Sequence, residues 1–75
     1  MRMDNVSASK EIKFLIFCIE EYKLEKGLRG SQTLDLFTRY GVSDYILACY
    51  EALHTTGRQY LMEDIDGFIK ERQTA

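Results

Sequence analysis

Apolar residues recur along this chain at intervals of three and four positions, the spacing that places side chains on one face of an α-helix. The clearest repeat comes first, and its predicted inner face comprises Ile12, Leu15, Ile16, Ile19 and Tyr22. The pattern predicts an all-α fold, a compact bundle of four short helices. These helices are expected at about 8–26, 31–40, 43–54 and 60–72.

Shorter repeats predict the inner faces of the other three helices. Their residues are Leu34, Phe37 and Tyr40 in the second, Ile46, Cys49, Tyr50 and Leu53 in the third, and Leu61, Ile65 and Phe68 in the fourth. Serine and glycine residues mark the expected helix ends. The candidate caps are Ser7 or Ser9, Ser31 and Ser43, and the candidate terminating glycines are Gly27, Gly41 and Gly57.

The length of 75 residues allows one domain with a small core. We expect a flexible N-terminus over residues 1–7 and a single helical domain over 8–73. The longest apolar run, residues 14–19, is far below the roughly 20 residues that span a bilayer. With no apolar leader in the first residues, a cytoplasmic protein without a membrane association is expected.

The second and third expected helices are separated by Gly41, which predicts helix-turn-helix-like packing of the two. In a DNA-binding protein of that kind, residues 43–54 would enter the major groove. This segment contains Asp44 and Glu51 but no lysine or arginine, and the formal net charge of the chain is −2. Because phosphate attraction supplies most non-specific affinity, nucleic-acid binding is only the alternative function.

Reactive side chains are few. Zinc requires four ligands at short spacings, and two distant cysteines with one histidine do not supply them, so no metal or other cofactor is predicted. Cys18 and Cys49 are interpreted as reduced, buried thiols, and a bridge between them stays open as the alternative. His54, the one histidine, has no nucleophile motif beside it. The sequence therefore indicates a protein that is not an enzyme.

The first expected helix has a second apolar stripe, formed by Phe14, Phe17 and Leu24 on the side opposite the first. A helix that is apolar on two sides is either enclosed by its own domain or shared with a partner. The sequence leaves these two alternatives open. The three residues are the first candidate interface.

The motif Tyr50-x-x-Leu53-His54-Thr55-x-Gly57-x-x-Tyr60, followed by Asp64 and Ile65, resembles a family of short bacterial proteins of unknown function. The resemblance implies an antitoxin, immunity or accessory role beside a co-encoded partner. It also implies a second candidate contact corner, made of Tyr50, His54, Thr55, Gly57 and Tyr60. The alternative is that this corner only fixes the junction between the third and fourth helices.

These observations favour a small, non-catalytic protein-binding module. Its partner is predicted to be a protein, either a second copy in a homodimer or the product of a neighbouring gene. A DNA-binding helix-turn-helix regulator is the alternative.

Overall fold

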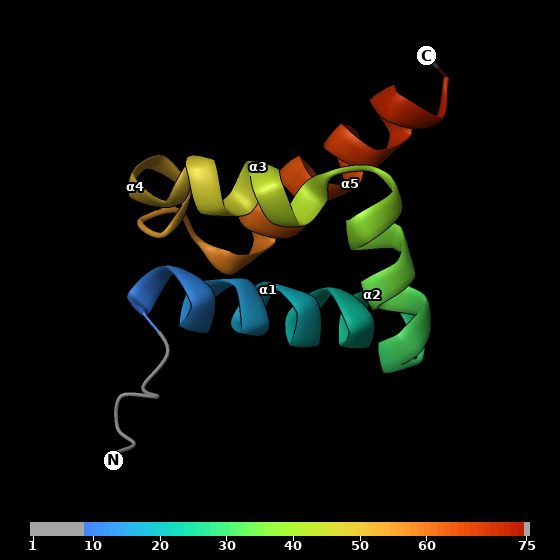
Figure 1. Cartoon of the computed structure of the whole chain (residues 1–75), viewed down its shortest axis with the longest axis horizontal. Helices are drawn as coiled ribbons and strands as arrows, with labels where there is room; N and C mark the ends of the chain where they lie inside the picture. The colour runs from blue at the N-terminus through green and yellow to red at the C-terminus, as the bar shows by residue number, and fades with distance from the viewer. Residues whose placement is uncertain (1–8, 75) are drawn as a thin grey trace.

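Five α-helices form the part of the chain that the computed structural model describes, residues 9–74. They are α1 (Lys10–Lys26), α2 (Gly30–Arg39), α3 (Val42–Ala48), α4 (Tyr50–Leu53) and α5 (Arg58–Gln73). In Figure 1, α1 and α3 lie side by side, α2 connects them at one end, and α5 passes behind α3. The all-α prediction is confirmed. The expected flexible segment, residues 1–7, lies outside the described residues.

The predicted count of four helices is wrong, because the third expected helix is divided at Cys49. Its φ and ψ of −106° and 21° depart from the α-helical values. Hydrogen bonds continue across the break, since the Cys49 N–H donates to the Tyr45 carbonyl oxygen and its own carbonyl accepts from the Leu53 N–H, both at 2.9 Å. The apolar repeat therefore runs through the division, and periodicity alone does not reveal it.

Three of the predicted end residues lie at helix ends in the structure. Ser9 caps α1, with its Oγ accepting the Ile12 N–H at 3.2 Å. Gly27 ends α1 with a φ of 65°, a backbone conformation that favours glycine, and Gly41 has a φ of 72° between α2 and α3.

Other predicted end residues are corrected by the structure. Because α2 and α3 begin one residue earlier than expected, Ser31 and Ser43 fall inside their first turns and make no side-chain cap. At the start of α2, the Arg29 N–H instead donates to Oε1 of Gln32 at 2.8 Å. Gly57 has an ordinary φ of −70° and precedes α5 in an extended conformation.

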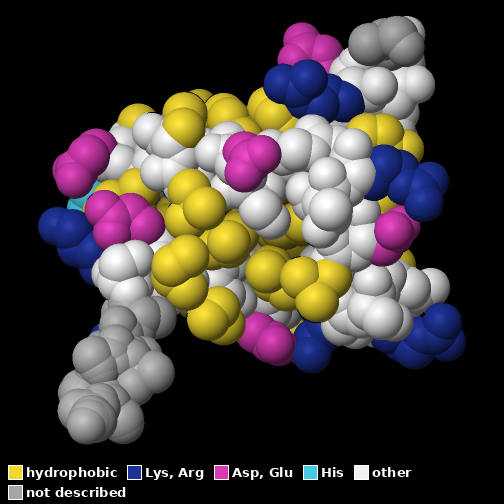
Figure 2. Space-filling model, viewed as in Figure 1, with side chains coloured by type: hydrophobic (Ala, Val, Ile, Leu, Met, Phe, Trp, Pro, Cys, Tyr) yellow, Lys and Arg dark blue, Asp and Glu magenta, His cyan; other side chains and the backbone are white. Residues whose placement is uncertain are grey.

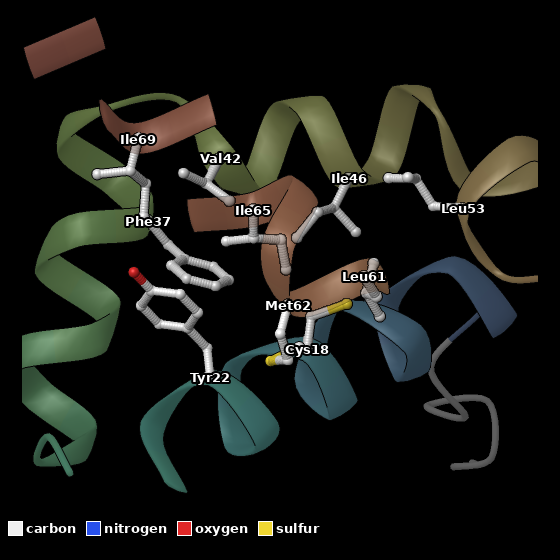
Figure 3. Packing of buried hydrophobic residues seen from close by; sticks show 10 residues of the cluster. All are labelled: Cys18, Tyr22, Phe37, Val42, Ile46, Leu53, Leu61, Met62, Ile65 and Ile69. Atoms are coloured by element: carbon white, nitrogen blue, oxygen red, sulfur yellow. The ribbon is translucent and has the colours of Figure 1, made fainter. Parts of the chain in front are cut away.

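All five helices contribute to one hydrophobic core, shown in Figure 3. The rings of Tyr22 from α1 and Phe37 from α2 lie 5.7 Å apart, centre to centre. The buried hydrophobic residues are Cys18, Tyr22, Phe37, Val42, Ile46, Leu53, Leu61, Met62, Ile65 and Ile69. Thr33 is also buried, and its hydroxyl donates to the Arg29 carbonyl oxygen at 3.1 Å.

The buried side of α1 is rotated from the predicted one. Cys18 and Tyr22 face the core, whereas Ile12 and Ile16, predicted to be inside, are exposed. In α2, similarly, Leu34 is exposed. Apolar residues surround most of α1, so periodicity does not select one face, and contacts with α2, α3 and α5 decide which residues are buried.

Candidate interaction surface

The side of α1 that points away from the core holds an unusual number of large apolar side chains. Their exposed fractions are 38% for Ile12, 52% for Ile16, 43% for Phe17 and 69% for Leu24. In Figure 2, hydrophobic side chains gather in the middle of the visible face, over α1 and between α1 and α3. Single exposed apolar residues are normal, but several on one helix mark a candidate binding surface.

The structure separates the three residues of the predicted second stripe. Phe14 is half-buried and packs against the core, with its ring edge-on to Tyr50 at a centre distance of 5.5 Å. Phe17 stacks on Phe14 at 6.2 Å but remains exposed, as does Leu24. Phe17 and Leu24 are thus available to a partner, whereas Phe14 joins Phe17 to the core.

Ile12 and Ile16 are surface residues that sequence reasoning assigned to the core. They occur four positions apart, on the opposite flank from Phe17 and Leu24. Charged residues lie between the two flanks. We use "outer surface of α1" for the set Ile12, Lys13, Ile16, Phe17, Glu20 and Leu24.

The outer surface of α1 has a definite charge pattern. Glu20 forms an ion pair with Lys23 at 2.9 Å. Lys13 is exposed and makes none of the ion pairs found among residues 9–74. The outer surface of α1 therefore has Lys13 and Glu20 along its middle, with apolar side chains on both sides of them.

Polar contacts hold the inner side of α1 to α5. The Tyr22 hydroxyl donates to Asp66 at 2.8 Å, and the Lys26 ammonium group donates to the same carboxylate at 2.9 Å. Although burial by itself would raise the pKa of Asp66, hydrogen bonds from Lys26 and Tyr22 outweigh it and lower that pKa. Arg58 at the start of α5 forms ion pairs with Glu21 and Glu25. Together with the apolar contacts of the core, these polar contacts hold the opposite side of α1 outside.

The second predicted corner is centred on two stacked rings. His54 lies parallel to Tyr50 at 4.3 Å, and its Nδ1 donates to the Tyr50 carbonyl oxygen at 2.8 Å. The Lys10 ammonium group lies 5.8 Å from the centre of the Tyr50 ring. The structure thus joins this part of the corner to the N-terminal end of α1.

The remaining corner residues lie in the turn before α5 or in its first residues. The Thr55 hydroxyl donates to the Ala52 carbonyl oxygen at 3.4 Å. The hydroxyl of Thr56, which was not among the predicted corner residues, donates to the Leu53 carbonyl oxygen at 2.8 Å. Gly57 is the residue that immediately precedes α5, and Tyr60 is 60% exposed. The threonine hydrogen bonds close the turn, whereas Tyr60 is directed to solvent.

A further aromatic cluster was not anticipated from the sequence. Tyr45 and Phe68 stack at 4.2 Å, and the Arg72 guanidinium lies 4.3 Å from the Phe68 ring. The Tyr45 hydroxyl donates to Asp64 at 2.7 Å, and this hydrogen bond, with burial, raises the pKa of Tyr45 to about 12. Open, shallow depressions border the stack on two sides. Since Tyr45 and Phe68 belong to two different helices, no periodicity within one helix identifies this pair.

The two cysteines are free thiols, with Cys18 buried and Cys49 half-buried. Burial raises the pKa of Cys18 to about 12, so its thiol is protonated at neutral pH. Within residues 9–74, no three histidine, cysteine or acidic side chains are grouped as metal ligands.

None of the described helices combines the length and apolar character needed to cross a membrane. Comparison with curated proteins gave no match, and neither did comparison with solved structures. A family model matches residues 13–72, which include most of α1 and nearly all of α5. The chain therefore belongs to the family described as Protein of unknown function (DUF3791).

Proposed function

We propose that this chain is a non-catalytic module that binds another protein through the outer surface of α1. The observation that carries this proposal is the exposure of Ile12, Ile16, Phe17 and Leu24 on one helix. Transfer of apolar area out of water contributes about 25 cal/mol per Å². A partner that covered these side chains would gain that free energy without rearrangement of the core.

The structure also favours a rigid binding element. The inner side of α1 is held to α5 by the contacts of Tyr22 and Lys26 with Asp66 and by the ion pair of Arg58 with Glu21. The ring of Phe14 also stacks on that of Phe17. Because these contacts already order the helix, a partner would not have to supply the free energy of ordering it. An antitoxin, immunity or accessory protein for a co-encoded partner would work in this way.

Phe17→Glu tests the surface directly, with Leu34→Glu as the matched control on α2. Leu34 is 52% exposed and Phe17 is 43% exposed, so both substitutions should preserve the fold and its helical circular dichroism. Tagged protein expressed in its native host would be purified, and its mass and co-purifying proteins measured. We expect Phe17→Glu to lose the assembly that the original chain forms and Leu34→Glu to retain it.

One outcome would contradict the proposal. Assembly that is the same in Phe17→Glu and in the original chain would show that the outer surface of α1 is not the binding surface. Unfolding of Phe17→Glu would show that the fold depends on this side chain. In that case Leu24→Glu, at the most exposed of the four apolar positions, repeats the test at lower structural cost.

DNA binding has less support. The residues of α3 and α4, together with Cys49 between them, include Asp44 and Glu51 but no lysine or arginine. A DNA complex would weaken steeply with salt because counterions are released on binding. Gel shifts at increasing salt, with DNA from upstream of the gene, would identify such a complex.

A further inference from the structure

The charge pattern of α1 identifies the kind of partner. We propose that the outer surface of α1 binds a second copy of this chain, with the two α1 helices antiparallel across a two-fold axis. This inference rests on the proposed function, because it names the partner for the same surface. It places the axis between Ile16 and Phe17.

Two opposite charges are spaced for this arrangement. Lys13 and Glu20 are seven residues apart, which is close to two helical turns, so their side chains project from one line along α1. Ile16 and Phe17 lie midway between them. Rotation about an axis at this midpoint places Lys13 of each copy opposite Glu20 of the other, which forms two identical ion pairs.

The apolar borders meet in the same arrangement. Ile16 and Phe17 lie on opposite sides of the Lys13–Glu20 line, and each lies beside the proposed axis. A two-fold axis therefore brings Ile16 against Ile16 of the second copy, and Phe17 against Phe17. Ile12 and Leu24 extend these two contacts toward the ends of the helix.

The same charges exclude the parallel arrangement. Two parallel helices in register would place Lys13 against Lys13 and Glu20 against Glu20, and like charges in contact oppose association. The apolar contacts would supply the affinity, while the ion pairs would set the direction of the helices.

The neighbouring basic residues do not oppose the antiparallel arrangement. Lys23 lies on the Ile16 side and is paired with Glu20 of its own chain at 2.9 Å. Lys10 lies on the Phe17 side, with its ammonium group 5.8 Å from the centre of the Tyr50 ring. Because the two-fold axis maps each side onto itself, Lys10 and Lys23 do not meet across the interface.

Charge reversal tests this geometry with the whole chain. Light scattering on purified protein should give twice the chain mass of 8.8 kDa. Lys13→Glu and Glu20→Lys should each raise the dissociation constant of the dimer by about a hundredfold, because each creates two like-charge contacts. Glu71→Lys, an exposed substitution on α5 with the same charge change as Glu20→Lys, should leave it unchanged.

The decisive sample is an equimolar mixture of the Lys13→Glu and Glu20→Lys chains. In an antiparallel heterodimer the two acidic groups of one variant face the two basic groups of the other, so the mixture should form a dimer at concentrations at which each variant alone is mainly a monomer. The double variant Lys13→Glu/Glu20→Lys should also dimerise. Loss of folding does not produce this pattern, because a misfolded variant is not rescued by mixing.

A monomeric original chain, or a mixture in which no dimer returns, would overturn the inference. Failure of this inference can be distinguished from failure of the proposed function. If the chain is a monomer, and Phe17→Glu still abolishes binding to another protein while Leu34→Glu does not, the outer surface of α1 is a binding surface for a different partner. If Phe17→Glu changes neither the dimer nor a complex with another protein, both the proposed function and this inference fail.

Discussion

The hydrogen bond from Tyr22 to Asp66 allows a quantitative test of how α1 is held to α5. Tyr22→Phe removes only the hydroxyl and keeps the ring beside Phe37. A hydrogen bond to a charged group contributes about 1.5–3 kcal/mol. Since Asp66 keeps its contact with Lys26 and is 22% exposed, water can replace part of the loss. We therefore expect a destabilisation of about 1.5 kcal/mol, at the lower end of this range.

Urea unfolding monitored by circular dichroism measures this change, at one protein concentration because association would add to the stability. In a thermal scan, about 1.5 kcal/mol corresponds to a decrease in Tm of roughly 6–12 °C for a domain of this size. Tyr60→Phe makes the same chemical change at a side chain that is 60% exposed, so it is the matched control and should have no effect.

A double-mutant cycle with Asp66→Ala separates the hydrogen bond from other effects of the hydroxyl. Once the acceptor is absent, Tyr22→Phe should cost less than about 0.5 kcal/mol, because no charged partner remains to be lost. The reasoning would be refuted if Tyr22→Phe lowered the free energy of unfolding equally with and without Asp66→Ala. It would also be refuted if Tyr22→Phe alone destabilised the protein as little as Tyr60→Phe.

Three other predictions follow from α5 and from the two thiols. A side chain at Gly67 would enter open space, so Gly67→Ala should stabilise the protein by about 0.5–1 kcal/mol in urea unfolding. In the folded protein iodoacetamide should alkylate the half-buried Cys49, while Cys18 should react only after unfolding, as peptide mass spectrometry would show. The pKa of Asp66 is lowered by folding, so its contribution to stability is present above the ordinary Asp value of about 3.9 and is lost as the pH falls through the lower value. Urea unfolding across this range should show that loss in the original chain and less of it in Asp66→Asn.

The two ends of α1 were predictable from local sequence, whereas several other helix ends were not. Gly27 was identified correctly, and Ser9 was one of the two candidate caps, because a cap depends on bonds within about one turn of the helix. Gly57 was identified as a turn residue, but its φ of −70° shows that the sequence did not reveal the kind of turn. The break at Cys49 was missed because the apolar repeat continues through it.

The candidate surface was predictable only in part. A second apolar stripe on the first helix was recognised from its sequence, and Phe17 and Leu24 are exposed in the structure. Phe14, from the same stripe, packs beside Tyr50 from α4. Ile12 and Ile16 were assigned to the core because they repeat with Tyr22, yet they are exposed. Spacing relates residues of one helix to each other, but it does not indicate which side its neighbours cover.

By itself, the sequence determined the all-α class, the positions of most helices and the end of the first helix at Gly27, and it narrowed the N-terminal cap of that helix to Ser7 or Ser9. These properties depend on interactions between residues a few positions apart. Only the tertiary structure decided that Ile12 and Ile16 face outward and that Phe14 packs against the core. Contacts such as Tyr22 with Asp66 join residues 44 positions apart, and their free energy selects one orientation of a helix that is apolar on nearly every side.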